Sequence, residues 1–125
     1  MRVAKVSEHD HQVSLMRWIA LSTPRYPVLG LVFAIPNGGA RHIKVAAKLK
    51  AEGVKKGIPD LFFAYPARGH HGLFIELKTE SGRVSKEQKE MIERLSKVGY
   101  KAVVCRGWED AKDEILNYLG VHSGY

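Results

Sequence analysis

The chain has 125 residues, a formal net charge of +7 and a sequence pI of about 9.6. This length allows one domain with a buried core. The positive charge makes a polyanionic partner such as nucleic acid plausible, although basicity that only aids solubility explains it equally well. A single cysteine, Cys105, excludes an intrachain disulfide and fits a reducing compartment. No apolar run approaches the ~20 residues that span a bilayer, so we expect a soluble, cytoplasmic protein.

The first predicted helix covers residues 7–21. Its apolar residues recur at three- and four-residue spacing, which predicts a buried stripe. The stripe comprises Val13, Met16 and Ala20, widened by Trp18 and Ile19. Ser7 or Asp10 could cap the first turn, where Glu8 complements the helix dipole. A glutamate at such a position is more often a dipole partner than a metal ligand.

Two prolines, Pro24 and Pro27, end this helix, and residues 29–35 then form a nearly continuous apolar run. The run predicts a central β-strand. It ends at Pro36-Asn37-Gly38-Gly39, whose residues suit a tight turn. The amides of this turn, with Arg41 just beyond, could also cradle a phosphate, although a simple turn is the default interpretation.

A second helix is predicted over residues 41–52, and Gly53 is a natural stop at its C-terminal end. Its pattern places four apolar residues inward and three lysines outward. These are Ile43, Ala46, Ala47 and Leu49 on one side and Lys44, Lys48 and Lys50 on the other. Lys55 and Lys56 follow in a basic, glycine-bearing loop, which would suit a position near a phosphodiester or any solvated surface.

Two apolar runs, residues 60–65 and 72–79, are rich in aromatic and branched side chains and predict a pair of strands. Alternate residues of a strand share a face, so Glu76 and Lys78 point the same way. If the two strands form a hairpin, Asp60 at the start of the first strand approaches Glu76. Two carboxylates and one ammonium group would then surround a single point.

The remaining elements complete an α/β pattern. Ser85 and Gln88 form a capping box for a helix that ends at Gly99, and a strand at 100–105 and a helix at 109–119 follow. This order predicts a small mixed sheet flanked by helices on both faces, with a right-handed crossover into the last strand if the strands are parallel. We expect a single domain with its core at about residues 8–119 and a disordered tail at 120–125.

The point shared by Asp60, Glu76 and Lys78 suits a divalent metal ion and a scissile phosphate. Magnesium prefers oxygen ligands and takes one or two carboxylates, and the backbone carbonyl of Leu77 could add another ligand. The ion would polarise a phosphoryl oxygen, while Lys78 could orient water or neutralise charge at phosphorus. The alternative, slightly favoured by spacing alone, is a cross-strand ion pair on a half-exposed sheet face. The strand context and the basic composition favour a metal-dependent nuclease.

Pro59-Asp60 followed by Glu76-Leu77-Lys78 resembles the signature of the PD-(D/E)xK nuclease superfamily. Flanking residues narrow the resemblance to the virus-type replication-repair nuclease (VRR-NUC) domain, in a stand-alone, phage-like form. These flanking residues are Glu8, Gln12, Pro36-Asn37-Gly38-Gly39, Arg41, Gly53, Gly57, Gly72-Leu73-Phe74-Ile75 and Gln88. The resemblance runs over about residues 8–119. One departure is His11, where relatives often carry an acidic residue.

The resemblance implies a restriction-endonuclease-like core and assigns roles to particular residues. Asp60 and Glu76 would bind Mg²⁺ or Mn²⁺, and Lys78 would be the catalytic lysine. Glu8 is a possible additional metal ligand, and Gln88 faces the active site, caps its helix, or does both. The candidate DNA-binding residues are Asn37, Arg41, Lys55 and Lys56.

The implied activity is endonucleolytic hydrolysis of DNA that is selective for branched structures such as four-way (Holliday) junctions or flaps, as in DNA repair. The resemblance also implies a homodimer in the cytoplasm of a bacterial or phage-infected cell. Two alternatives stay open. One is a non-catalytic DNA-binding module on a nuclease scaffold, and the other is a restriction-type enzyme that reads the sequence of linear duplex.

Overall fold

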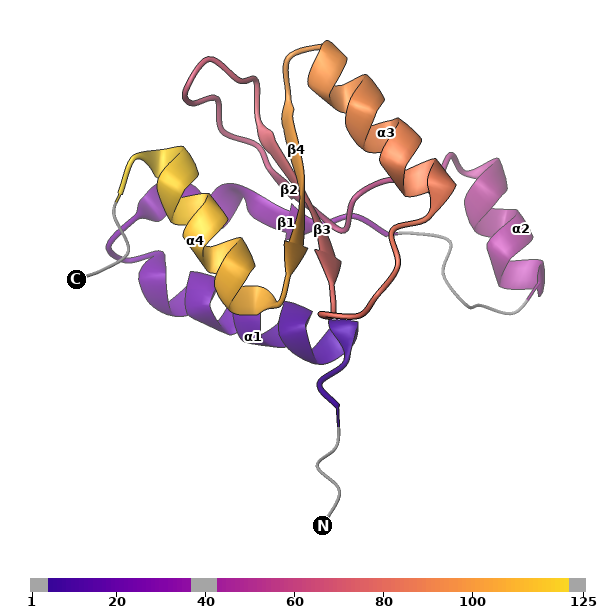
Figure 1. Cartoon of the computed structure of the whole chain (residues 1–125), viewed down its shortest axis with the longest axis horizontal. Helices are drawn as coiled ribbons and strands as arrows, with labels where there is room; N and C mark the ends of the chain where they lie inside the picture. The colour runs from indigo at the N-terminus through magenta and orange to yellow at the C-terminus, as the bar shows by residue number, and fades with distance from the viewer. Residues whose placement is uncertain (1–4, 37–42, 122–125) are drawn as a thin grey trace.

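The computed structural model describes residues 5–36 and 43–121 of the chain, and within them the helices and strands alternate (Figure 1). The helices are α1 (Glu8–Ser22), α2 (Ile43–Ala51), α3 (Lys86–Lys97) and α4 (Trp108–Leu119), with a short 3-10 helix, η1 (Pro27–Leu31). The strands are β1 (Val32–Ala34), β2 (Leu61–Phe63), β3 (Leu73–Lys78) and β4 (Lys101–Arg106). In this part of the chain no helix is long and apolar enough to cross a membrane.

The strands form one mixed sheet in the order β1-β2-β3-β4. Antiparallel pairing joins β1 to β2 and β2 to β3, whereas β3 and β4 are parallel. The predicted hairpin is therefore confirmed, and so is the connection of the last strand to the sheet through a helix. The parallel pair needs the long connection that α3 supplies, because parallel strands cannot be joined by a tight turn.

Helices cover both faces of the sheet, as the sequence predicts. On one face the buried side chains of β3 and β4, Leu73, Ile75, Leu77 and Cys105, join a core with residues of α1 and α4. On the other face Glu76 accepts a hydrogen bond from Gln88 of α3. Figure 1 shows α1 and α4 together on one side of β3 and β4, and α3 on the other. Glu76, and with it Lys78 two residues along β3, thus lies on the α3 face of the sheet.

The buried stripe of α1 agrees with the predicted one only in part: Ile19 is buried and Trp18 packs against the core, as predicted. Leu15 and Ile19 are buried against the sheet, whereas Val13 is 37% exposed and Ala20 is also exposed. Only Met16 of the predicted i, i+3, i+7 set packs against the core, and only partly. Apolar residues occupy two faces of this helix, and spacing cannot tell which face meets the sheet. On the second face, Val13 and Ala20 remain exposed to solvent.

The prediction of a central strand at residues 29–35 is wrong in two respects. The first part of that run forms η1, which begins at Pro27, and only Val32–Ala34 pair as β1. Proline fixes φ near the value that a helical first residue needs, so the chain turns before it extends. β1 then lies at an edge of the sheet, where Phe33 is 48% exposed.

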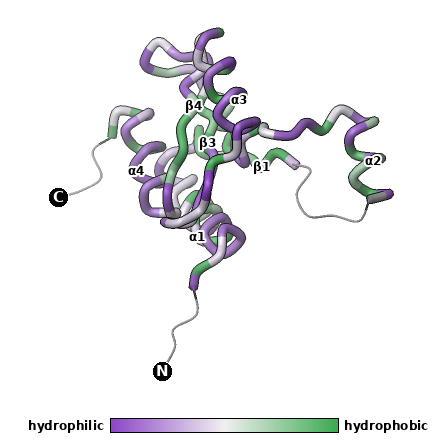
Figure 2. Tube along the Cα trace, turned by 45° about the vertical axis from the view of Figure 1, so that its right-hand side comes forward, coloured by the Kyte–Doolittle hydropathy of each residue, from purple (hydrophilic) through white to green (hydrophobic). Residues whose placement is uncertain are grey.

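Helix α2 also departs from expectation, because none of its described side chains, residues 44–51, is buried. Of the four residues predicted to face inward, Ala46 and Leu49 are half-buried and Ala47 is exposed, while the side chain of Ile43 lies outside the described set. Figures 1 and 2 both show α2 standing apart from the sheet and the other helices. An amphipathic pattern therefore produced a helix that does not join the core.

Candidate active site

Asp60 and Glu76 meet because of the hairpin register. Leu61 pairs with Ile75, so the residue before β2 lies opposite Glu76. The backbone N–H of Leu77 donates a hydrogen bond of 2.7 Å to Asp60 Oδ2, which fixes the Asp60 carboxylate against β3. The predicted approach of the two carboxylates is confirmed.

Glu8 adds a third carboxylate from the first turn of α1. Ser7 caps this helix, and the return bond of the capping box comes from Asp10, so the Glu8 side chain is not used by the box. One carboxylate oxygen each from Glu8, Asp60 and Glu76 lies within 4.8 Å of the others. The three differ in burial, because Glu8 is exposed, Asp60 is half-buried and Glu76 is buried.

Glu76 is the electrostatic centre of the cluster. Its side chain is 2% exposed, and burial raises the pKa of its carboxyl to about 8, with the negative charge of Asp60 adding to the rise and Lys78 opposing it. No N–H or O–H group in the described parts of the chain donates to Glu76 Oε1, although the atom is buried. A buried acceptor without a donor is costly unless a cation or another group satisfies it. The oxygen-only donor set of the cluster fits a hard divalent cation.

Lys78 lies beside Glu76 on the same face of β3. Its Nζ is 3.6 Å from Glu76 Oε2, and its side chain is 9% exposed. The alternative of a pair on a half-exposed sheet face is wrong, since both side chains are buried. Burying such a pair costs desolvation energy and is weak evidence for a role in stability alone. The ammonium group is instead held close to the carboxylate cluster.

Gln88 combines the two interpretations that the sequence left open. Its Oε1 accepts the N–H of Ser85 at 2.8 Å, and its own N–H donates to Ser85 Oγ, which completes the capping box of α3. Its Nε2 donates to Glu76 Oε2 at 3.1 Å. One side chain therefore both fixes the start of α3 and orients the Glu76 carboxylate.

The backbone carbonyl of Leu77 lies on the β2 side of β3. Within an extended strand, the N–H and C=O of one residue point to the same side. Since the Leu77 N–H donates to Asp60, its carbonyl also faces Asp60 rather than β4. The neighbouring carbonyl, that of Lys78, accepts a hydrogen bond from Gly107 on the β4 side.

Two residues that sequence reasoning did not assign hold this region together. His11 Nδ1 accepts the N–H of Trp108 at 3.1 Å and so caps α4, whose own N-cap residue, Gly107, has no side chain to do so. Arg106 Nη1 donates to three carbonyls of the loop after β3, those of Thr79, Glu80 and Gly82. Because a glycine at the N-cap has no side chain, the first N–H groups of the helix need an acceptor from elsewhere in the chain. The Arg106 contacts have no comparable signal in the sequence.

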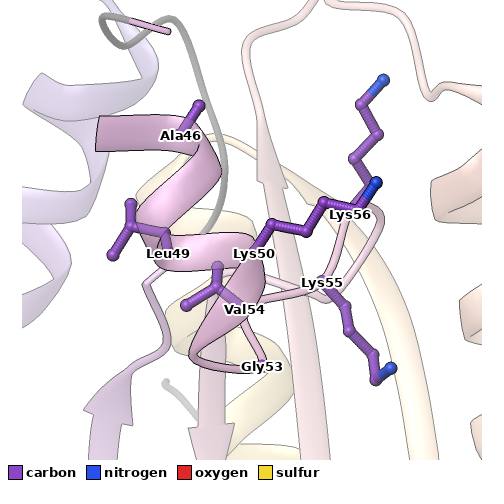
Figure 3. Close-up of a pocket in the computed structure, with 7 residues that line it drawn as sticks. All are labelled: Ala46, Leu49, Lys50, Gly53, Val54, Lys55 and Lys56. Atoms are coloured by element: carbon purple, nitrogen blue, oxygen red, sulfur yellow. The ribbon is translucent and has the colours of Figure 1, made fainter. Parts of the chain in front are cut away.

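Lys55 and Lys56 precede Asp60 by five and four residues, but they do not line the pocket that Asp60 and Glu8 line. They line a pocket of about 530 Å³ between α2 and the following loop. The other lining residues are Ala46, Leu49, Lys50, Gly53 and Val54. Figure 3 shows Lys55 and Lys56 leaving the loop in different directions. The predicted DNA-binding residues Asn37 and Arg41 lie outside the described residues.

An open groove of about 710 Å³ connects the cluster with the solvent-facing side of α1. Glu8, Asp60 and Leu77 line the groove where it meets the cluster. The rest of its lining comes from α1: His9, Gln12, Val13, Met16, Arg17 and Ala20. The apolar residues predicted for the core thus line, in large part, a groove beside the candidate site.

A mixed sheet that brings carboxylates and a buried lysine to one point, with helices on both faces, is the arrangement of a nuclease-type domain. Comparison with known families identifies which one. The family model of the VRR-NUC domain matches residues 6–109, and the chain belongs to this family. A solved structure described as a VRR_NUC domain protein is 31% identical with a TM-score of 0.80, over 97% of this chain and 94% of that one. A comparison with curated proteins gives no match.

Proposed function

We propose that the protein is a divalent-metal-dependent DNA endonuclease that is selective for branched DNA such as four-way junctions or flaps. The observation that carries the proposal is the buried Glu76 carboxylate, which has an unsatisfied Oε1, lies beside Lys78 and converges with Asp60 and Glu8. The chain belongs to a family of nucleases, which supports hydrolysis of nucleic acid in general. The net charge of +7 supports a polyanionic substrate.

In this proposal Asp60, Glu76 and the Leu77 carbonyl would hold Mg²⁺ or Mn²⁺, and Glu8 would be an additional ligand. When bound, the ion supplies Lewis-acid polarisation of a phosphoryl oxygen and lowers the pKa of a coordinated water. Asp60 needs its bond from the Leu77 N–H to keep one oxygen directed at the cluster. Gln88 holds the Glu76 carboxylate in one orientation by donating to Oε2, which leaves Oε1 for the ion.

Lys78 carries the positive charge nearest to the substrate phosphate in this arrangement. Its ammonium group stabilises the negative charge that develops at phosphorus, or orients the attacking water. Because the side chain is only 9% exposed, little solvent screens this charge. A lysine held in place before the reaction needs no reorganisation in the transition state.

The selectivity for branched DNA and the homodimer rest on resemblance to the family. Lys55 and Lys56, together with Asn37 and Arg41, would contact the DNA backbone. Such contacts neutralise phosphates without reading sequence, which suits an enzyme that recognises DNA shape.

The proposal is tested with labelled four-way junctions, flaps, single strands and linear duplexes of shared sequence, incubated with Mg²⁺, Mn²⁺ or EDTA. We expect cleavage of the branched substrates with either ion and none with EDTA. Asp60→Asn, Glu76→Gln and Lys78→Met should each lower the rate by at least about 100-fold. Lys97→Met, which removes a lysine that is 73% exposed on α3, is the matched control and should leave the rate unchanged.

Three other outcomes contradict parts of the proposal. Cleavage at wild-type rates by all three site variants would refute the site assignment. Metal-independent junction binding without cleavage would favour a non-catalytic DNA-binding module. Cleavage of linear duplex at defined sequences, with branched DNA no better, would favour a restriction-type enzyme.

A further inference from the structure

The exposed face of α1 carries apolar side chains, whereas a solvated helix face is ordinarily polar. Residues 9, 12, 13, 16, 17 and 20 follow three- and four-residue spacing, so they share one side of the helix. Three of them, Val13, Met16 and Ala20, are apolar; Met16 packs partly against the core, whereas Val13 and Ala20 are exposed. An apolar stripe that is left open next to a reactive site is typical of a surface that binds something.

The chemistry of this stripe fits one kind of occupant. Polar or charged side chains, those of His9, Gln12 and Arg17, accompany the apolar residues along the groove. Nucleic acid offers both matching surfaces, because bases and sugars have apolar faces and phosphates carry negative charge. Proteins that handle exposed bases place apolar side chains against them and cationic side chains on the backbone.

The groove also continues directly into the candidate site. Glu8 and Asp60 line it together with the α1 side chains, so whatever lies in the groove reaches the carboxylate cluster. A protein partner seated here would cover the cluster, whereas a substrate strand has to reach it. Glu8 and Arg17 are nine residues apart, about 13 Å along an α-helix. At about 3.4 Å of rise per stacked nucleotide, this length accommodates more than one nucleotide.

We propose that the α1 groove binds an unpaired DNA strand adjacent to the scissile phosphate, with bases on Val13, Met16 and Ala20 and a backbone phosphate on Arg17. In a paired duplex the flat faces of the bases are stacked inside and only their edges are accessible, whereas unpaired bases expose a face to an apolar helix surface. The groove therefore selects substrates that have an unpaired segment beside the cut. This inference rests on the proposed nuclease function and narrows its substrate class.

The test uses variants that change the groove without touching the carboxylates. Val13→Ser combined with Arg17→Gln removes an apolar contact and a cation, and Ala20→Glu places a negative charge in the groove. Leu21→Ser is the apolar control, because Leu21 is 82% exposed on α1 but does not line the groove. Arg94→Gln, on the exposed side of α3, is the charge control. These positions are exposed, so all the variants should fold, which circular dichroism would check.

Two measurements are made on each variant. Fluorescence anisotropy in EDTA gives the affinity for a labelled single strand and for a duplex of the same sequence. Cleavage of a flap substrate in Mg²⁺ gives KM and kcat. We expect the groove variants to weaken single-strand binding and raise KM by about tenfold or more, consistent with the contribution of one base contact. Duplex affinity and kcat should change less than twofold, and the two controls should match the wild type.

The outcomes separate this inference from the proposed function. Unchanged single-strand affinity in both groove variants overturns the groove assignment, even if the enzyme cleaves DNA normally. An equal loss for single strand and duplex also overturns it, because the groove would then act only through charge. Absence of metal-dependent cleavage in the wild type, with single-strand binding still lost in the groove variants, refutes the nuclease proposal and leaves the groove as a binding site.

Discussion

Removing the buried charge of Glu76 should flatten the pH dependence of stability of the metal-free protein. The pKa of this carboxyl is about 8 in the folded chain, against an ordinary value of 4.5. Because the folded pKa is raised, the folded state holds the proton more tightly than the unfolded state does. The stabilising contribution is therefore complete below pH 4.5 and is lost as pH rises through about 8. At about 1.4 kcal/mol per pH unit the loss amounts to about 5 kcal/mol.

Urea denaturation at pH 5, 7 and 9 in EDTA measures this effect. Glu76→Gln keeps the shape of the side chain but cannot ionise. The free energy of unfolding of Glu76→Gln minus that of the wild type should therefore be several kcal/mol larger at pH 9 than at pH 5. Glu90→Gln removes a carboxylate that is 60% exposed on α3 and should follow the wild type at every pH. Comparing slopes between variants removes the contribution of other titrating groups.

Magnesium adds a second arm to the same experiment. A cation that binds only the ionised site stabilises the wild type more as pH rises, since ligand carboxylates must lose their protons. Glu76→Gln should show little such stabilisation. If the wild type and Glu76→Gln differ by a constant amount from pH 5 to pH 9, the reasoning about the buried carboxylate is wrong.

Two further predictions concern the scaffold. His11→Ala removes the cap that Trp108 uses at the start of α4 and should cost about 1 kcal/mol in the free energy of unfolding, read from urea denaturation; an unchanged midpoint would exclude the cap. Gly57→Ala should destabilise the protein more than Gly53→Ala. Both glycines have positive φ, so both substitutions strain the backbone. Only at position 57 would the added Cβ also clash, because it would lie 2.5 Å from the Glu87 carbonyl oxygen. Equal losses of melting temperature would contradict this.

The hairpin and its three reactive side chains could be predicted from the sequence because strand geometry is local. Alternation alone puts Glu76 and Lys78 on one face, and a short connection between two apolar runs favours an antiparallel pair. Asp60, at the start of the first run, then lies near Glu76 on the paired strand. The observed register, Leu61 against Ile75, realises the predicted approach of Asp60 to Glu76.

Other parts could not be predicted, because their conformation depends on what packs against them. The apolar run 29–35 is compatible with a strand or a turn of helix, and Pro27 decided in favour of η1. The apolar residues of α1 form two stripes, and only the assembled sheet determines that Leu15 is buried while Val13 and Ala20 are exposed. Helix α2 has an amphipathic sequence, but none of its described side chains is buried in the core.

The position of Glu8 depends both on local sequence and on tertiary packing. Its place in the first turn of α1 can be read from the Ser7 cap, but its distance from Asp60 depends on how α1 is held against the sheet. His11, one turn later, is hydrogen-bonded to the start of α4, and α4 packs on the same core as Ile19. The first turn of α1 is thereby tied to α4 as well as to the core. His11, which stands where relatives often carry an acidic residue, therefore has a structural hydrogen bond to Trp108. The carboxylate that α1 contributes beside Asp60 and Glu76 is that of Glu8.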